Sequence, residues 1–455
     1  MTRWFPRVAL AVLVVGLALH NLVMALLYGA GLRGSALDVV AAWKDVLLIA
    51  AIVAAFLAAR AVSDNLSLTG RSALPLWADR LAALYGVLVV VYFLIPQSWL
   101  DGQATTRGEV LALRHHLLPV GAYLLGRLLT LDARWWRRLG WLILVTAFGV
   151  ALWGLVDVYL VPLQTWRDSG VPGWFSDQLG FSYKCFGGLP ENWIYNTGDE
   201  TNPLRRLVSV LLSPLATAYL LVVALLWVAA KPPRRWALGL GVVAYVGLLW
   251  THTRAALVAL TLGLLVIALI RRRWEPAALG VASLVVAAVV IAAFPTIGPS
   301  TSYTATELQC LRDEAAKASS TAEGDGLAGD SSSRSHFRNL RDGLHTVLTH
   351  PQGFGLGNAG VTAARTTGKI KAGESTYTEL GVDLGLAGML VFAGWLGTLA
   401  WGLWRRSEWL AATVVAIAFV GIQTDVIGVP WIAVVVFALG GAAVGSRLPE
   451  ETAGE

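Results

Sequence analysis

The sequence predicts an all-α, polytopic membrane protein with about twelve transmembrane helices. Of its 455 residues, 56% are hydrophobic and only 14% are charged, whereas soluble domains carry roughly 25% charged residues. The mean hydropathy is +0.63, and apolar runs of about 20 residues, each long enough to cross roughly 30 Å of hydrocarbon, recur along the chain. The basic residues that give the net charge of +6 collect in short loops between these runs, so this charge does not indicate binding to nucleic acid.

The apolar runs form a long N-terminal block and a short C-terminal one. We expect nine helices in residues 1–294 and three in 377–446, followed by a short cytoplasmic tail, 447–455. The expected spans are 8–29, 38–60, 79–96, 114–131, 139–161, 207–229, 236–251, 255–270, 275–294, 377–402, 409–427 and 430–446. The first run is too long for the apolar part of a signal peptide and lacks an obvious cleavage site, so it predicts a membrane helix.

The distribution of Lys and Arg among the short loops predicts the orientation of the chain. With the N-terminus in the cytoplasm, five arginine-rich loops also lie there, as the positive-inside rule requires. These loops carry Arg60/Arg71/Arg80, Arg134/Arg137/Arg138, Lys231/Arg234/Arg235, Arg271/Arg272/Arg273 and Arg405/Arg406. Both termini are then cytoplasmic, and two longer segments, 162–206 and 295–376, lie outside the plasma membrane.

The two cysteines of the chain fall one in each of these outer segments, Cys185 and Cys310. Thiols on the oxidising side of a membrane tend to pair. The sequence therefore predicts a disulfide that ties the first outer loop to the larger one, with two unpaired thiols as the alternative.

The larger outer loop contains a basic, amphipathic stretch, 331–350. Arg334, Arg338, Arg341 and His345 follow one another at i, i+4, i+7 and i+11, a spacing that places them on one stripe of a helix. The adjoining face is apolar, with Phe337, Leu340, Leu344, Val347 and Leu348. Such a helix either contacts an anionic ligand or is attracted to anionic lipid head groups.

A glycine-rich turn and a carboxylate follow this helix. Between 331 and 373 six basic residues stand against one acid, Asp342, an excess that favours an anionic ligand. In 353–360 closely spaced glycines could present backbone N–H groups to an anion, and we expect Gly355, Gly357 and Asn358 to contact it. Glu374 then stands just before the tenth helix, where partial desolvation raises the pKa of a carboxylate and allows it to act as a general base. The alternative is an acid stabilised by the helix dipole.

Other charges near the ends of the spans have simpler interpretations. Lys44 and Asp45 contact each other or a bound phosphate, and the internal pair is the preferred interpretation. Asp157 and Asp425 lie close to outer ends, where solvated or capping roles suffice.

Three arginines stand at outer boundaries of the predicted helices: Arg254, Arg205 and Arg206. They either line an outward cavity or anchor helices at the membrane surface. We also expect Tyr377, at the start of the tenth helix, to contact the substrate.

Several chemistries lack their sequence signatures in this chain. It has no DxD-type pair, HExxH, CxxC, GxSxG or Walker loop. We therefore expect neither a metal site nor a cofactor, and arginines would supply the electrostatic stabilisation that a metal gives to a diphosphate.

With these residues in view, the chain resembles the O-antigen ligase and O-antigen polymerase superfamily, membrane glycosyltransferases of the C-type class. Thr251-His252-Thr253-Arg254 resembles the family's Ser-x-Ser-Arg-like element, and His350-Pro351-Gln352-Gly353-Phe354-Gly355 resembles its Pro-x-Gly-x-Gly-like turn. The spacing of the ligase signature is also matched: Glu374-Ser375 is followed by nine residues and then by Gly385-Leu386-Ala387-Gly388. Glu374 stands where the ligases have His. The likeness covers roughly 240–400; before that only the topology and a loose Arg114…Gly126-Arg127 pattern fit.

The resemblance implies a glycosyltransferase of the plasma membrane whose active site faces outward. The implied reaction is a metal-independent, inverting transfer of a glycan from polyprenyl diphosphate to a sugar hydroxyl on a second lipid-linked glycan or a lipid core. Glu374 would be the base, and Arg254 with Arg334 or Arg338 would bind the diphosphate; the departure at Glu374 favours a polymerase or a divergent branch. The alternatives are a transporter or flippase of lipid-linked saccharides and an inactive scaffold of envelope assembly.

Overall fold

The computed structural model describes residues 4–63, 76–181, 183, 185–195, 203–231, 235–321, 331–366 and 375–445, with backbone alone at 61–63, 314–321 and 331–336. Glu374, Lys369 and Lys371 lie outside the described residues, as does the side chain of Arg334. The cytoplasmic tail predicted at 447–455 lies outside them too.

The described part of the chain is a bundle of apolar helices. Seven stretches are long and apolar enough to cross a membrane: α1 (Phe5–Gly29), α2–α3 (Ser35–Arg60), α4 (Trp77–Leu94), α6 (Ala133–Leu160), α11 (Arg254–Arg271), α12 (Glu275–Ile297) and α16 (Thr376–Trp404). Four more are shorter: α9 (Pro214–Ala230), α10 (Arg235–Trp250), α17 (Glu408–Val420) and the pair η5–α18 (Ile432–Gly445). The chain is therefore a polytopic membrane protein.

The remaining long helix of the bundle, α5 (Thr106–Leu128), is more polar because it carries Arg114, His115 and His116. Each of the twelve expected spans overlaps one of the helices named so far. That all twelve cross the membrane stays a prediction, as does the orientation of the chain.

Short elements fill the connections between the membrane helices. α2 and α3 cover Ser35–Ala41 and Trp43–Ser63, and η5 and α18 cover Ile432–Val436 and Phe437–Gly445. The short connecting helices are η1 (Gln97–Trp99), α7 (Leu163–Arg167), α8 (Val171–Gly173), η2 (Trp174–Gln178), η3 (Glu191–Trp193), η4 (Ser209–Leu211) and α15 (Gly360–Thr366). Two longer helices, α13 (Ala305–Thr321) and α14 (Ser331–Thr349), lie between α12 and α15 in the sequence. β1 (Ile194–Tyr195) and β2 (Leu204–Arg205) form an antiparallel pair, with Ile194 opposite Arg205.

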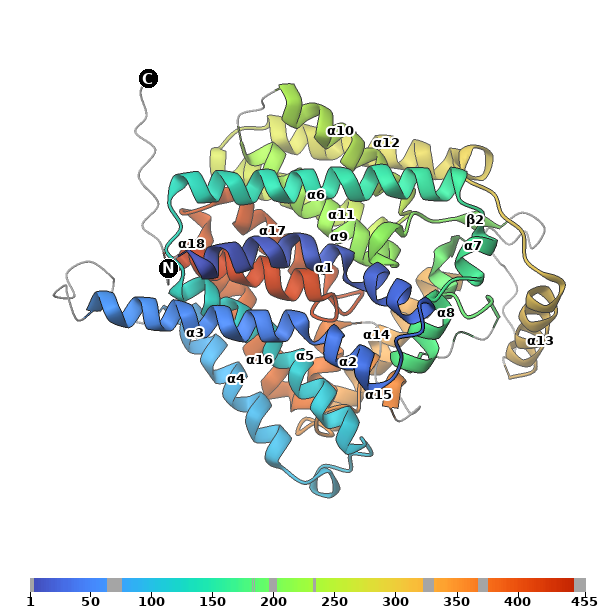
Figure 1. The fold of residues 1–455 in the computed structure, drawn as a ribbon, viewed down its shortest axis with the longest axis horizontal. Helices are drawn as coiled ribbons and strands as arrows, with labels where there is room; N and C mark the ends of the chain where they lie inside the picture. The colour runs from blue at the N-terminus through green and yellow to red at the C-terminus, as the bar shows by residue number, and fades with distance from the viewer. Residues whose placement is uncertain are drawn as a thin grey trace.

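Helices far apart in the sequence pack side by side in the bundle, as Figure 1 shows. α18 packs against α5, α17 against α11, and α16 against α4. Small residues permit the first contact: a Cβ added at Gly126 of α5 would lie 2.0 Å from the Ala438 carbonyl oxygen of α18. Close approach through glycine is a common way for membrane helices to associate, because lipid tails provide no hydrophobic drive between them.

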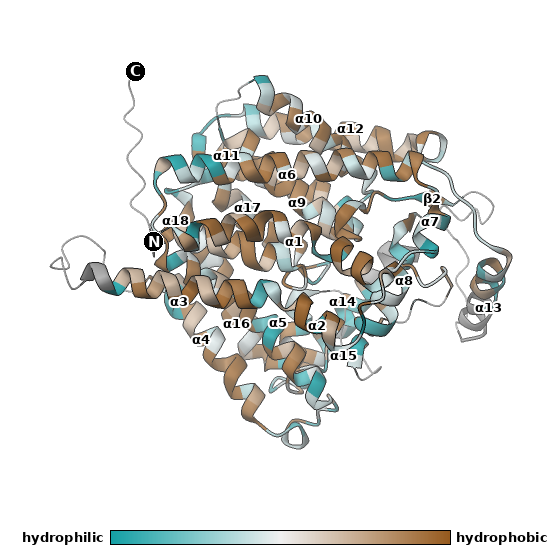
Figure 2. Ribbon diagram, in the orientation of Figure 1, coloured by the Kyte–Doolittle hydropathy of each residue, from teal (hydrophilic) through white to brown (hydrophobic). Residues whose placement is uncertain are grey.

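The long helices of the bundle are mostly apolar along their lengths (Figure 2). Large aliphatic side chains such as Val53, Val87, Val242 and Val289 are 51–63% exposed. Exposed apolar side chains in such numbers are unfavourable in water but are what contact with lipid tails requires.

A small apolar core lies outside the main bundle, under the first long loop. Its buried side chains include Trp166, Trp174, Phe186 and Trp193. The disulfide predicted from sequence is present: Cys185 in this loop is bonded to Cys310 of α13. Arg167 adds a bidentate contact to Glu307 at 3.0 and 2.8 Å. The loop that follows α6 and the start of the segment that follows α12 are thus joined.

Removal of this disulfide is expected to lower the stability of the loop region. The bridge closes a separation of 125 residues, and loss of a native disulfide typically costs about 2–5 kcal/mol. The Cys185→Ser/Cys310→Ser variant should therefore unfold at a lower temperature in detergent than the wild type. Reductant should lower the wild-type midpoint and leave that of the variant unchanged; equal midpoints for all samples would contradict the prediction.

Asp157 and Arg205 form a buried ion pair, which corrects two expectations. Asp157 is 0% exposed, not solvated. Its Oδ1 accepts from Arg205 Nη2 at 3.2 Å and from Trp166 Nε1 at 2.6 Å. Arg205 Nη1 also donates to the carbonyl oxygens of Asp157 and Val161. Because its guanidinium is committed to these acceptors, Arg205 holds the loop on α6 and is not placed as a substrate contact.

Candidate active site

Two arginines meet where α10 ends and α11 begins. The turn between these helices is 251–253, in which His252 has a left-handed φ of 50°. Arg206 holds this turn: its Nε donates to the Thr251 carbonyl at 2.9 Å and its Nη2 to Thr253 Oγ1 at 3.1 Å. Arg254 is the first residue of α11 and is exposed. One arginine therefore fixes the turn, and the other is free to reach into solvent or towards a ligand.

The electrostatics of this turn favour an anion. Burial lowers the pKa of Arg206 to about 10, and the charge of Arg254 acts in the same direction. Burial and both arginines lower the pKa of His252 to about 4, so its imidazole is neutral near pH 7. Two neighbouring guanidinium groups repel each other, and an anion between them would relieve that repulsion and accept strong, charge-assisted hydrogen bonds.

A polar connection leads from Arg206 to α5. Arg206 lies within electrostatic range of Tyr219 in α9, and Tyr219 lies within electrostatic range of Asp425. Asp425 accepts from Gly428 N at 3.0 Å and lies 3.2 Å from His115 Nε2. The expectation of a solvated Asp425 is wrong, because its side chain is only 8% exposed; its carboxylate accepts from Gly428 N within the turn at 425–428.

The start of α16 is fixed on this same loop between α17 and η5. Thr376 N donates to the Gly421 carbonyl and Thr376 Oγ1 to the Thr424 carbonyl, each at 2.9 Å. Ser375 Oγ donates to the Gly421 carbonyl at 3.2 Å. Glu374 itself lies outside the described residues, but Ser375, the next residue in the chain, is anchored on the loop that contains Asp425. Tyr377, expected at the substrate, donates its hydroxyl to the Ala418 carbonyl at 2.9 Å.

The glycine-rich turn binds a carboxylate of the same chain, that of Asp383. Gly353, Gly355 and Gly357 all have positive φ. However, Gly357 N and Asn358 N donate to Asp383 of α16, at 3.2 and 3.0 Å. The expectation that these N–H groups contact a substrate is corrected: the Asp383 carboxylate already occupies them.

The side chain of Asn358 is also used within the chain. Its Nδ2 donates to Gln97 Oε1 and to the Phe354 and Gly355 carbonyls, and its Oδ1 accepts from Gln103 N. Gly355 therefore takes part through its carbonyl in a structural turn. These residues shape the loop above α16, and the structure does not place them as ligand contacts.

Asp383 is a residue that the sequence analysis missed. It is 2% exposed and lies 3.1 Å from His116 Nε2, while His116 Nδ1 contacts the Tyr85 hydroxyl at 3.1 Å. An acid in the middle of an apolar run is the signal that could have found it, because such an acid is costly without partners.

The backbone geometry at Gly385 explains why the first residue of the Gly-x-x-Gly element is glycine. Its φ of 71° and ψ of 176° interrupt the helical geometry of α16. Leu386 N donates to the Pro351 carbonyl at 2.8 Å across this break, and a Cβ at Gly385 would lie 2.6 Å from the same oxygen. Only glycine allows both the backbone conformation and the close approach of the turn at 351–353.

α14 occupies the segment in which the sequence predicts an amphipathic helix. Among the α14 residues whose side chains are described, Gly343 and Val347 are buried, and they pack on Thr378 and Gly381 of α16. Arg338, Arg341 and His345 are exposed. Phe337, Leu344 and Leu348 are exposed as well, so part of the apolar face has no protein cover. Convergence of Arg334 or Arg338 with Arg254 stays a prediction.

Lys44 and Asp45 do not pair with each other. Lys44 Nζ donates to the Ala41 carbonyl at 2.8 Å and lies 3.1 Å from His20 Nε2. Asp45 accepts two bonds from Arg114, at 3.1 and 2.6 Å. The side chains of adjacent helix residues point in different directions. Lys44 and Asp45 therefore have partners on different helices, α1 and α5.

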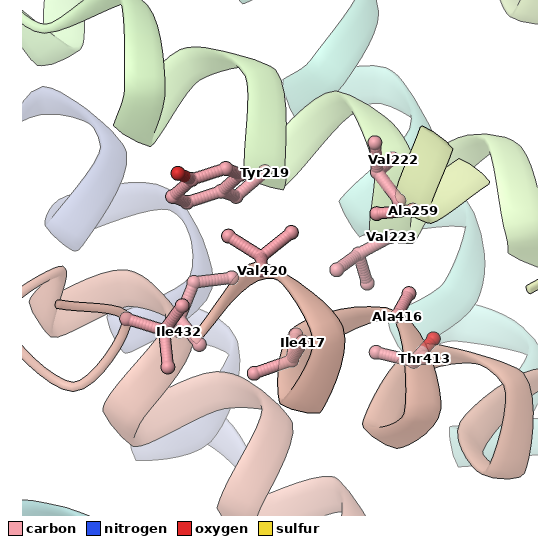
Figure 3. A pocket seen from close by; sticks show the side chains of 10 residues that line it. Tyr219, Val222, Val223, Ala259, Thr413, Ala416, Ile417, Val420 and Ile432 are labelled. Atoms are coloured by element: carbon pink, nitrogen blue, oxygen red, sulfur yellow. The ribbon is translucent and has the colours of Figure 1, made fainter. Parts of the chain in front are cut away.

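An apolar pocket lies between α9, α11, α17 and η5 (Figure 3). Apart from Tyr219 and Thr413, its lining is aliphatic, including Val223, Ile417 and Ile432. In Figure 3 the Tyr219 hydroxyl points away from the other lining side chains. The pocket offers nothing to hold a diphosphate, so the candidate site is the arginine turn and not this pocket. Across the described ranges, no three His, Cys, Asp or Glu side chains lie together as a metal site would require.

The fold and the site define a polytopic membrane protein with a basic, arginine-bearing turn beside the fixed start of a late membrane helix. Residues 239–402 match the O-antigen ligase family, and this match supports the expected resemblance to the O-antigen ligase and polymerase family. The matched segment runs from α10 to α16 and contains Arg254, α14, the glycine turn and the Gly-x-x-Gly element. No curated protein matches the chain.

Proposed function

We propose that the protein transfers a glycan from polyprenyl diphosphate to a sugar hydroxyl at the outer face of the plasma membrane. The observation that supports this function most strongly is the electrostatic link from the Arg206–Arg254 turn, through Tyr219, to the loop at 421–425 that anchors Ser375, the residue after Glu374. A diphosphate needs cations, and an acceptor hydroxyl needs a base. The match of residues 239–402 to the O-antigen ligase family favours the same reaction class.

In the proposed mechanism the acceptor hydroxyl oxygen attacks the anomeric carbon of the donor sugar. The bond from that carbon to the phosphate oxygen breaks, and inversion at the anomeric carbon follows from a single displacement. Glu374 takes the hydroxyl proton. Arg254, with Arg334 or Arg338, stabilises the charge that develops on the leaving polyprenyl diphosphate, in place of a metal ion.

The test of this function is the product made by the purified protein in liposomes. With a lipid-linked glycan as donor and acceptor, mass spectrometry should find a longer or re-attached glycan and an equal amount of free polyprenyl diphosphate. The reaction should continue in the presence of EDTA. Translocation of the donor without a new glycosidic bond would contradict the proposal and identify a flippase; binding of the donor without either outcome would identify a scaffold.

Arg254→Gln is expected to lower kcat by about 10²–10³, because removal of one charge-stabilising contact in the transition state has an effect of that size. The donor should still bind, since Arg206 remains. Arg273→Gln is the matched control: Arg273 is exposed just beyond the other end of α11, and its substitution removes the same charge. Equal turnover by the two variants would remove Arg254 from the mechanism.

A further inference from the structure

An apolar stripe on α14 is exposed. Phe337, Leu344 and Leu348 are 73%, 44% and 59% exposed, and their spacing of i, i+7 and i+11 places them on one face of the helix. Three large apolar side chains exposed together on one helix indicate a surface that contacts another apolar body. We call these three residues the α14 stripe.

α14 lies beside the start of a membrane helix. Gly343 packs against Thr378 of α16, and Val347 lies so close to Gly381 that a Cβ added there would be 2.5 Å from Val347 Cγ2. α16 is among the helices that are long and apolar enough to cross a membrane. One side of α14 is therefore fixed on a membrane helix, and the α14 stripe lies on a different side.

Aromatic side chains mark the membrane surface near the end of α14. The hydroxyl of Tyr92, in the last turn of α4, donates at 2.7 Å to the carbonyl of Gln352, which follows α14 closely. Leu94, the last residue of α4, and Trp99 of η1 are 72% and 78% exposed. Tyr and Trp gather where membrane helices leave the hydrocarbon, because each ring is apolar and carries one polar group. The end of α14 thus lies at the level where α4 leaves the membrane.

Basic side chains border the α14 stripe. Arg341 comes four residues after Phe337 and seven before Leu348, so it projects from the same side of the helix. His345 follows one turn later, and both side chains are exposed. A helix with an apolar face and cations along its edge is typical of helices that lie in a membrane surface. There the apolar side chains enter the lipid and the arginines reach the head-group phosphates.

Phospholipid is the partner that this position favours. α4 and α14 both pack on α16, and α4 exposes Val87, Val90 and Leu94 along its length. The α14 stripe therefore continues a surface that already faces lipid tails, and a second protein would have to displace lipid to reach it. The phosphate of an anionic phospholipid also complements the charge of Arg341.

We infer that α14 docks on the membrane through Phe337, Leu344 and Leu348, with Arg341 bound to the phosphate of an anionic phospholipid. This docking does not depend on glycosyl transfer. It gives α14 two supports, α16 on one side and lipid on another, which together hold the helix at the membrane surface. Arg338, a candidate of the proposed mechanism, lies about 100° round the helix from Phe337 and is not part of the stripe.

The test places a fluorescent dye at single positions of α14 in the full chain. Leu344→Cys, Leu348→Cys and Asn339→Cys are each labelled with a thiol-reactive nitrobenzoxadiazole dye, which does not react with the native cysteines because they are bonded to each other. Asn339, exposed on the opposite side of the helix from the stripe, is the matched control. In phosphatidylcholine nanodiscs, nitroxide on the lipid tails should quench the dyes at 344 and 348 severalfold more strongly than the dye at 339. Iodide in the water should give the reverse order.

A second comparison tests Arg341. With nitroxide on the head group, phosphatidylglycerol should quench the dye at 344 about fivefold more effectively than phosphatidylcholine, which is the effect of one basic residue near an anionic surface. Arg341→Gln should remove this preference. Arg137→Gln, which removes an exposed arginine at the start of α6, should leave it unchanged. Each variant must keep the wild-type thermal midpoint, so that a change in quenching reports on docking.

Three results would contradict the inference. Equal iodide quenching at 344, 348 and 339 would show that the α14 stripe faces water. Protection from both quenchers that disappears when the protein is diluted in detergent would show that a second copy of the chain covers the stripe. Equal quenching by the two head-group lipids in the presence of Arg341 would remove that residue from lipid binding.

Discussion

Glu374→Gln is expected to lower turnover by about 10²–10⁴, the usual contribution of a general base. Glutamine keeps the size and polarity of the side chain but cannot accept the proton of the acceptor hydroxyl. Donor binding should stay unchanged, because the diphosphate is held by arginines. The measurement is single-turnover transfer with purified lipid-linked glycan, together with the Kd of the donor.

Two companion variants distinguish a base from a structural acid. Glu374→His should retain a large part of the activity, since the ligases carry histidine at the matching position of their signature. Its turnover should fall as the pH drops through about 6.5, the ordinary pKa of histidine, because only the neutral imidazole accepts a proton. Glu275→Gln, in the exposed first turn of α12, is the control for a helix-dipole role. Full turnover by Glu374→Gln would refute the assignment.

The features that the sequence predicted well are those set by local pattern and by composition. Apolar runs predicted the membrane helices because, in lipid, the backbone N–H and C=O groups of a segment must form hydrogen bonds within that segment. The two thiols in two long loops predicted the disulfide, because the chain has no other cysteine. The arginine-bearing helix at 331–350 followed from the 3.6-residue period, and the structure has α14 there.

The features that the sequence could not supply are the partners of buried charges. Asp45 pairs with Arg114 across 69 positions, Asp157 with Arg205 across 48, and His116 with Asp383 across 267. Periodicity shows which face of a helix is apolar but not which helix covers the polar positions. The glycine turn illustrates the same limit. Its sequence indicated that it can bind an anion, but only the packing of α16 shows that this anion is the Asp383 carboxylate.

Replacement of Asp383 is expected to destabilise the protein more than any other single change considered. The carboxylate accepts from Gly357 N, Asn358 N and His116 Nε2 in a site that is 2% exposed. Asp383→Leu leaves three buried polar groups without their acceptor, and removal of one partner from a buried pair typically costs about 3–5 kcal/mol.

Asp383→Asn tests the polarity of this site separately from its volume. An amide presents an oxygen on one side and a donor on the other, so at least one of the N–H groups of the turn would face a donor. Both variants should lower the thermal midpoint in detergent, and Asp342→Asn, an exposed acid on α14, should not. Because the turn at 353–358 packs against the break at Gly385, loss of the carboxylate should also expose 353–360 to faster amide hydrogen exchange. Unchanged midpoint and exchange in Asp383→Asn would mean that the turn is held by the Asn358 side chain and not by the carboxylate.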